Sequence, residues 1–346
     1  MFFALPEIYV PLDMVLLLGA SGLLGHNVLR LLLERGVSVR VLLRPGSQLR
    51  VDAPEVMRGS LLDYGTLLQA AAGCDAVINC AGTTDMSLPR VEDFNPVNRD
   101  LPVLLCRLLE QTGIATLVHT STANTIAPGT HERPTDESAP FAAPFDRAPY
   151  AISKKAGEDA LLAWAAAHPD RRVVVVNPGF MLGAYDPKPS SGTLLLAGWR
   201  RRLMAGPRGG KSFLHVRDAA TAICNGLERG ASGRYLLTGE SLTLREFYTL
   251  QAQVLGYRQH FVTLPSPLVR AAGRLGDLLR RLGVRTMLSS INVAQLLVEE
   301  GYDCSKADGE LGLPHTPVAD AIRDFFDWRG DHLPHSHSLS RPRRGA

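Results

Sequence analysis

The chain has 346 residues, of which 45% are hydrophobic and 21% are charged. This composition excludes a largely disordered chain and is typical of a globular protein with one large domain or two coupled lobes. The 37 Lys and Arg residues nearly balance the 34 Asp and Glu residues. The resulting net charge of +3 argues against a nucleic-acid partner. No run of 18 apolar residues occurs, so no membrane span is expected.

The cysteines are scattered and none lies in a C-x-x-C pair: Cys74, Cys80, Cys106, Cys224 and Cys304. An odd, scattered set argues against a disulfide framework or a zinc site and favours a reducing compartment, by default the cytoplasm. Residues 1–13 lack a basic segment and are predicted to form an arm, not a secretion signal. Residues 330–346 lack apolar periodicity and are predicted to be disordered. The histidines of this tail do not change the expectation that the protein holds no metal.

Short aliphatic and β-branched runs alternate with segments of helical periodicity along the chain. The predicted strands are 15–18, 37–43, 55–58, 76–80, 117–120 and 173–177. The predicted helices lie near 23–35, 64–72, 98–112 and 149–167. This alternation predicts an α/β fold with a doubly wound parallel sheet of the Rossmann type, which binds ligands beyond the carboxyl ends of its strands.

A glycine-rich turn joins the first strand to the first helix, with the sequence GASGLLG over residues 19–25. Glycine allows a tight turn and a close approach of backbone N–H groups to a pyrophosphate, which the positive end of the helix also favours. An ordinary strand-to-helix turn is the alternative, but the strand–turn–helix order favours dinucleotide binding. The candidate pyrophosphate-binding residues are Gly19, Ser21, Gly22, Leu23, Leu24 and Gly25.

The second and third strands end at residues suited to the adenosine half of a dinucleotide. Arg44 follows the second strand where NAD sites usually carry a carboxylate, so the sequence favours NADP(H) over NAD(H), unless Arg44 is merely a solvated strand end. Leu62 and Asp63 follow the third strand and are placed near the adenine, although Asp63 is also a good N-cap. Ala81, after the fourth strand, is one of several small residues where a cofactor ribose would pass.

Hydroxyl and phenol groups follow the fifth strand. Ser121 and Thr122 lie at its carboxyl end, and Tyr150 precedes Lys154 by four residues in the next predicted helix. Residues i and i+4 share one helix face, so the phenol and the ammonium can reach one small volume. Each feature alone also has a structural explanation, because hydroxyls cap loops and Y-x-x-x-K recurs by chance. Their combination predicts a substrate-oxygen clamp.

These motifs, with Asn177-Pro178-Gly179 and residues 213–218, occur in an order that resembles the extended short-chain dehydrogenases/reductases. Within them the chain resembles NAD(P)-dependent epimerase/dehydratase proteins of the dihydroflavonol-4-reductase type, over roughly residues 14–329. The resemblance implies that Thr122, Tyr150 and Lys154 are catalytic. It also implies cofactor contacts from Tyr150, Lys154, Ser121, Pro178 and Gly179. Residues 99–102 and Ile126 depart from the family pattern and leave the substrate open.

The family chemistry pairs hydride transfer at carbon with proton transfer at oxygen. A free tyrosine, with a pKa near 10, is a poor base at pH 7. Bringing the pKa of Tyr150 near 7 costs roughly 4 kcal/mol, and an ammonium about 4.5 Å away supplies roughly 3.7 kcal/mol at a dielectric near 20. Lys154 is therefore predicted to tune Tyr150, while Thr122 holds the substrate oxygen.

The predicted function is an NADP(H)-linked oxidoreductase acting on a secondary alcohol or ketone of a small molecule. A nucleotide-sugar epimerase or dehydratase is the alternative within the enzyme class. A non-catalytic dinucleotide-binding sensor or scaffold is the alternative of another class. The resemblance also implies a possible homodimer through the helix that carries Tyr150 and its neighbour.

Two units are expected: a dinucleotide-binding domain, 14–178 plus 213–239, and a smaller discontinuous C-terminal substrate lobe, 179–212 plus 240–329. The segment 268–298 is amphipathic and rich in arginine. It is interpreted either as a lobe helix with a charged exterior or as a helix at a membrane surface, which leaves peripheral membrane contact open. Lys188 is placed in a loop over the nicotinamide.

Overall fold

The structure, a computed structural model, describes residues 13–49, 51, 55–187 and 189–332. Three predicted features lie outside the described residues: the N-terminal arm except Asp13, the tail from residue 333 onward, and the loop position Lys188.

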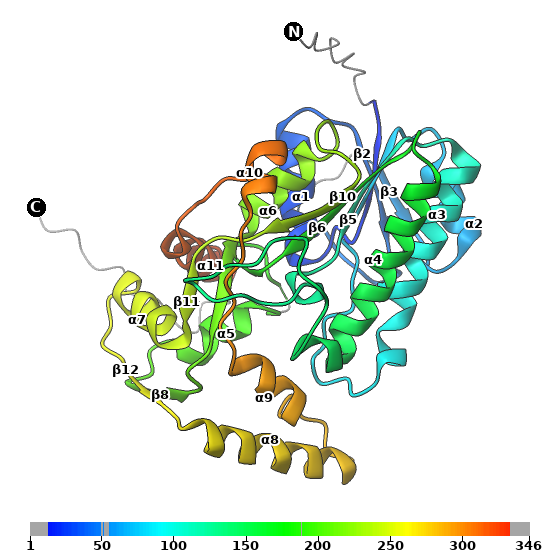
Figure 1. The fold of residues 1–346 in the computed structure, drawn as a ribbon. Coiled ribbons are helices and arrows are strands. Elements are labelled where there is room, and N and C mark those ends of the chain that lie inside the picture. The colour runs from blue at the N-terminus through cyan, green and yellow to red at the C-terminus, as the bar shows by residue number, and fades with distance from the viewer. Residues whose placement is uncertain (1–12, 50, 52–54, 188, 333–346) are drawn as a thin grey trace, which may run out of the picture.

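Seven parallel strands form the central sheet in the order β10-β6-β5-β4-β1-β2-β3 (Figure 1). The strands are β1 (Val15–Leu18), β2 (Val39–Leu43), β3 (Glu55–Arg58), β4 (Ala76–Asn79), β5 (Thr116–Thr120), β6 (Arg172–Pro178) and β10 (Gly233–Leu237). Leu18 is level with Leu42 of β2 and with Asn79 of β4, so the carboxyl ends of the central strands meet at one edge. The predicted doubly wound sheet is confirmed, and β1 and β3 have the predicted bounds.

Helices cover both faces of this sheet: α1 (Leu23–Glu34), α2 (Tyr64–Ala71), α3 (Leu101–Thr112), α4 (Pro149–Ala167), α6 (Val216–Asn225) and α10 (Ser305–Leu311). The alternation of side chains along β1 divides the core between the two faces. Val15 and Leu17 pack with α1 and α6, whereas Leu16 and Leu18 pack with α2, α3 and α4. Burial on both faces explains why β1 reads as a continuous aliphatic run.

The chain after β6 builds a second, smaller unit. It contains the strands β7 (Phe180–Leu182), β8 (Leu203–Gly206), β9 (Gly210–His215), β11 (Ser241–Thr243) and β12 (His260–Thr263). Its helices are α5 (Gly192–Gly198), α7 (Leu244–Val254), α8 (Ser266–Arg281), α9 (Ser290–Leu296) and α11 (Val318–His332). Phe213 stacks on Phe247 with 4.4 Å between ring centroids, and Phe325 is fully buried in the same core.

The expected bounds of the two units stay a prediction, and two elements of the structure cross them. β9 forms a three-stranded sheet with β7 and β11 and runs across the boundary expected between residues 212 and 213. α11 continues to His332, three residues past the expected end of the lobe at 329. The segment 268–298 folds as α8 and α9 joined by a turn.

Short helical turns complete the description: 3-10 turns at Val91–Asp93, Ala123–Thr125 and Phe145–Arg147, and a π turn at Pro96–Asp100. The helix predicted near 98–112 thus begins with the π turn. Gly157 of α4 lies against it, since a Cβ there would meet the Asn98 carbonyl oxygen at 2.1 Å. This close approach holds α4 beside the strand ends that carry the candidate site.

Candidate active site

The glycine-rich turn lies between the carboxyl ends of β1 and β4, where the strand order reverses. Gly19 has φ +84°, and a Cβ there would meet the Ala81 nitrogen at 2.6 Å. A Cβ on Gly25 would meet the Gly19 carbonyl oxygen at 2.2 Å. Both positions therefore require glycine, and the turn aims the N-terminus of α1 out of the strand-end edge. These residues fit the diphosphate of a dinucleotide.

The ends of β2 and β3 lie next to this turn. Arg44 is exposed after β2, and its carbonyl oxygen accepts a hydrogen bond from the Ser47 nitrogen at 3.1 Å. Arg58, at the end of β3, donates to the Ser47 carbonyl oxygen at 2.9 Å, so two cations border this loop. Asp63 caps α2 by accepting from the Thr66 nitrogen at 2.9 Å, and hydrogen bonds from Thr66 lower its pKa. Its predicted contact with adenine stays a prediction.

Lys154 projects from α4 into the protein beneath the carboxyl end of β5. Its side chain is 3% exposed, and the ammonium donates to the Thr120 carbonyl oxygen at 2.9 Å. Burial lowers the pKa of Lys154 to about 8, although Cys80 and Glu158 act in the opposite direction. A Cβ on Gly82 would lie 3.1 Å from the ammonium, so this glycine leaves the space that the lysine fills.

Tyr150 lies one turn before Lys154 and is partly exposed. Burial of its hydroxyl raises its pKa, whereas a side-chain hydrogen bond with Thr122 lowers it. The structure thus brings the predicted Thr122 and Tyr150 hydroxyls together. The ammonium of Lys154 is directed at a backbone carbonyl, and lowering of the pKa of Tyr150 by Lys154 stays a prediction.

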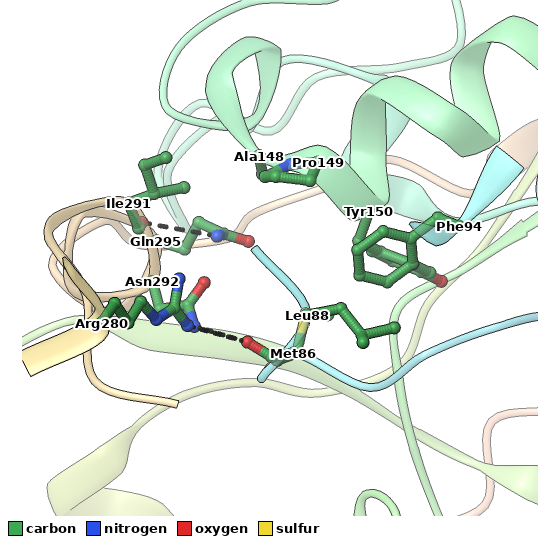
Figure 2. Close-up of a pocket in the computed structure, with 10 residues that line it drawn as sticks. All are labelled: Met86, Leu88, Phe94, Ala148, Pro149, Tyr150, Arg280, Ile291, Asn292 and Gln295. Atoms are coloured by element: carbon green, nitrogen blue, oxygen red, sulfur yellow. Dashed lines mark hydrogen bonds between the residues drawn. The ribbon is translucent and has the colours of Figure 1, made fainter. Parts of the chain in front are cut away.

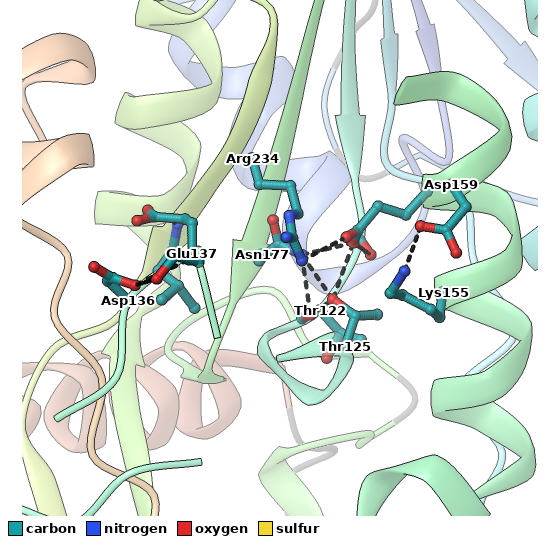
Figure 3. A network of polar contacts seen from close by, with 12 residues as sticks. Thr122, Thr125, Asp136, Glu137, Lys155, Asp159, Asn177 and Arg234 are labelled. Carbon is teal, nitrogen blue, oxygen red and sulfur yellow. Dashed lines mark hydrogen bonds and ion pairs between the residues drawn. The ribbon is translucent and has the colours of Figure 1, made fainter. Parts of the chain in front are cut away.

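Glu158 is a buried residue of this site that the sequence analysis missed. One carboxylate oxygen accepts three hydrogen bonds: from Ser121 Oγ at 2.6 Å, Asn177 Nδ2 at 2.7 Å and Thr125 Oγ1 at 3.0 Å, the last two of which Figure 3 labels together with Arg234. The other lies 3.5 Å from the Arg234 guanidinium. The carboxylate therefore ties α4 to the ends of β5 and β6. Its signal was the spacing 150, 154 and 158, which puts three polar groups on one face of the helix.

Asn98 makes a second buried junction, on the other side of α4. Its amide oxygen accepts from the Thr83 nitrogen at 2.8 Å, and its amide nitrogen donates to Ser153 Oγ at 3.0 Å. Ser153 in turn donates to the Tyr150 carbonyl oxygen at 2.7 Å. The chain after β4 is thereby linked to the first turn of α4, which carries Tyr150.

Two further residues that were predicted to contact the cofactor, Ser121 and Gly179, make close contacts within the protein. The hydroxyl of Ser121, expected beside the nicotinamide, is 3% exposed and donates to Glu158. Gly179 follows Pro178 at the end of β6, and a Cβ there would meet the Ser212 carbonyl oxygen at 2.5 Å. Their contacts with a cofactor stay predictions.

A pocket opens directly beside Tyr150 (Figure 2). Tyr150 and Phe94 form one wall, with 6.1 Å between their ring centroids. The opposite wall comes from α8 and α9 of the smaller unit. The lining residues are Met86, Leu88, Phe94, Ala148, Pro149, Tyr150, Arg280, Ile291, Asn292 and Gln295. The lining is therefore mostly apolar, with polar groups on the side away from Tyr150.

On the side of the pocket away from Tyr150, one backbone carbonyl binds side chains of both α8 and α9. Met86 O accepts from Arg280 Nη2 at 3.1 Å and from Asn292 Nδ2 at 3.1 Å. Phe145, next to the pocket residue Ala148 in a small core cluster, is fully buried and does not line the pocket. The sequence analysis assigned the segment that forms α8 and α9 to the substrate lobe but named none of its residues as lining the site.

The family of the chain follows from comparison with known proteins. The model of the NAD dependent epimerase/dehydratase family matches residues 15–237. The chain belongs to this family. It is therefore an NAD(P)-dependent enzyme of the extended short-chain dehydrogenase/reductase type, and that prediction is confirmed.

Relatives that resemble the chain over nearly its whole length are named as reductases. It is 30% identical over 331 residues to a 4-hydroxy-2-methyl-3-oxo-4-farnesyl-3,4-dihydroquinoline-1-oxide ketoreductase of Stigmatella aurantiaca, covering 92% of this chain and 98% of the relative. It is 27% identical over 342 residues to a putative dihydroflavonol 4-reductase of Synechocystis, covering 92% and 95%. The solved structure of gox2253 superposes with a TM-score of 0.79 at 26% identity, covering 92% of this chain and 98% of that one.

The buried ammonium of Lys154 predicts how stability depends on pH. The pKa of Lys154 falls from the ordinary lysine value of 10.5 to about 8. Between these values the unfolded chain binds the proton and the folded chain does not, so stability rises with pH. We expect the free energy of unfolding of the wild type, relative to Lys154→Met, to grow by about 3 kcal/mol from about pH 7 to about pH 10.5 in urea titrations.

Lys155→Met is the matched control, because it removes one ammonium from the outer side of the same helix, where Lys155 pairs with Asp159. A difference between the wild type and Lys154→Met that stays constant across this pH range would contradict the prediction.

Proposed function

We propose that the protein is an NADP(H)-dependent reductase of a ketone, or a dehydrogenase of the corresponding secondary alcohol. The observation that carries this proposal is the contact of the Thr122 and Tyr150 hydroxyls after β5, with Tyr150 lining a pocket and the Lys154 ammonium buried one helical turn away at the Thr120 carbonyl oxygen. The name of the ketoreductase relative supports the same reaction class.

The protein's own groups supply binding and proton transfer in this proposal. When bound, the nicotinamide supplies the hydride, or accepts it in the reverse direction. Thr122 donates a hydrogen bond to the substrate oxygen and holds it against the phenol of Tyr150. Tyr150 gives its proton to the oxygen as the alcohol forms, and takes one from the alcohol in the oxidative direction. The Lys154 ammonium stabilises the phenolate that remains.

The pocket has a volume of about 10 Å³, room for about one water, so a substrate enters only if the walls move apart. Its lining favours an apolar portion beside the ketone. Met86, Leu88, Phe94 and Ile291 offer apolar surface next to Tyr150. The ketoreductase relative is named for a substrate that carries a farnesyl chain, which agrees with such a lining. A nucleotide sugar, the substrate class of the epimerase alternative, would need charged and hydrogen-bonding partners along most of its length.

Replacing the phenol tests the proposal directly. We expect Tyr150→Phe to bind NADPH as the wild type does but to lose turnover by at least ~10²-fold with any accepted ketone, because the proton donor is gone. Fluorescence titration of NADPH and steady-state kinetics measure the two effects.

Tyr64→Phe is the control, because it removes an exposed phenol that donates to Gln111. Full turnover by Tyr150→Phe would reject the proposed proton donor. A wild type that binds NADPH and turns over nucleotide sugars but no ketone or alcohol would reject the proposed reaction.

The position of Arg44 after β2 is the basis on which we propose a preference for NADP(H), and a separate variant tests it. A guanidinium beside the 2′-phosphate is worth roughly 1.5 to 3 kcal/mol. We expect Arg44→Ala to raise KM for NADPH by about 10-fold or more and to leave KM for NADH nearly unchanged. Arg133→Ala, which removes an exposed arginine outside the site, is the control. Equal effects on the two coenzymes would reject a role for Arg44 in binding the phosphate.

A further inference from the structure

Helix α8 lies along the edge of the molecule farthest from the seven-stranded sheet, with α9 between part of it and the rest of the protein (Figure 1). Its inner face is made of small residues. A Cβ on Gly276 would meet the Leu288 carbonyl oxygen at 2.2 Å, and one on Gly273 would meet the Ser290 Cα at 3.0 Å. Asp277 accepts a hydrogen bond from the Ser290 nitrogen at 3.0 Å. These contacts fix which face of α8 points outward.

The outward face carries a stripe of leucines. Leu268, Leu275, Leu278 and Leu282 recur at intervals of seven, three and four residues and are 52% to 71% exposed. Met287, in the turn toward α9, is 60% exposed. Such spacing puts large apolar side chains on one side of a helix. Contiguous exposed apolar surface of this kind marks an interaction site.

A row of arginines borders this stripe. Arg270, Arg274 and Arg281 recur at intervals of four and seven residues and are all exposed. Between residues 266 and 288 there are five arginines and one aspartate, which gives a local net charge of +4. The cationic row and the leucine stripe lie side by side around the helix axis, because 100° of rotation per residue separates them by roughly a quarter to a third of a turn.

We propose that α8 and the turn after it, residues 266–288, dock on the surface of a membrane that contains anionic phospholipids. The leucines enter the boundary between headgroups and acyl chains, and the arginines contact the headgroup phosphates. The helix lies in the plane of the surface. With 16 residues it is about 24 Å long, shorter than a hydrocarbon core of about 30 Å. Within the described part of the chain no helix is long and apolar enough to cross a membrane.

The charges favour a lipid surface over a second copy of the chain. Two copies that met through this face would bring their arginine rows together. Asp277, the carboxylate of this segment, already accepts from the Ser290 nitrogen and lies toward α9. An anionic bilayer supplies the negative charges that the same surface of a second copy lacks.

The docking surface adjoins the candidate active site. Arg280 on the inner side of α8, and Ile291 and Asn292 of α9, line the pocket beside Tyr150. A docked protein would therefore hold the α8–α9 wall of this pocket near the headgroup layer, where an apolar ketone concentrates. This delivery route rests on the proposed function, whereas membrane docking does not.

Vesicle flotation of the full-length chain, without cofactor or substrate, tests the inference. We expect binding to phosphatidylcholine vesicles that contain about one third phosphatidylglycerol, and at least ~10-fold weaker binding to phosphatidylcholine alone or in high salt. The triple variant Leu275→Gln, Leu278→Gln, Leu282→Gln should bind anionic vesicles at least ~10-fold more weakly. The triple variant Arg270→Gln, Arg274→Gln, Arg281→Gln should do the same.

The controls are Val103→Gln, which alters an exposed apolar residue on α3, and Arg133→Gln, and both should bind as the wild type does. Circular dichroism and thermal unfolding check that the variants fold. Failure of the wild type to bind anionic vesicles, or undiminished binding by both triple variants, would overturn the inference. So would a concentration-dependent dimer that the leucine variant abolishes while vesicles are not bound. Loss of ketone reduction with intact vesicle binding would reject the proposed function alone.

Discussion

Two buried charges one turn apart on α4 fix the position of the candidate catalytic tyrosine. Lys154 donates to the Thr120 carbonyl oxygen, and Glu158 accepts from side chains at the ends of β5 and β6. Removing an ammonium and a carboxylate from water is costly, and these hydrogen bonds offset that cost only in one register of the helix. The first turn of α4, with Tyr150, is thereby held at the strand-end edge of the sheet.

The same edge brings together elements with different physical roles. The turn at Gly19 and Gly25 exposes the N-terminus of α1, which suits a diphosphate. Thr122 follows β5, two strands along the sheet from β1, and Tyr150 lies on the first turn of α4, while α8 and α9 close the pocket through the Met86 carbonyl oxygen. The nucleotide-binding unit thus supplies the proposed chemistry. The smaller unit supplies one wall of the pocket and the surface proposed to meet a membrane.

The sequence predicted those features that depend on local patterns. β1 is a run of four aliphatic residues buried on both faces, and the glycine-rich turn follows it directly in the sequence, so both features are visible as local patterns. Glu158 was missed because its partners come from two strands that are distant in sequence. The contact of Lys154 with Thr120 was missed because it uses a backbone oxygen, which leaves no mark in the sequence. The place of α8 over the pocket depends on packing through Gly273 and Gly276, which no local pattern reveals.

The account rests on the position of the Tyr150 hydroxyl relative to the substrate. A crystal structure of the protein with NADP⁺ and a secondary alcohol would measure this position directly. The account predicts that the alcohol oxygen lies about 3 Å from both the Tyr150 Oη and the Thr122 Oγ1, with the Lys154 ammonium on the nicotinamide side of the phenol. An alcohol bound away from Tyr150, or a phenol turned out of the dinucleotide cleft, would contradict it.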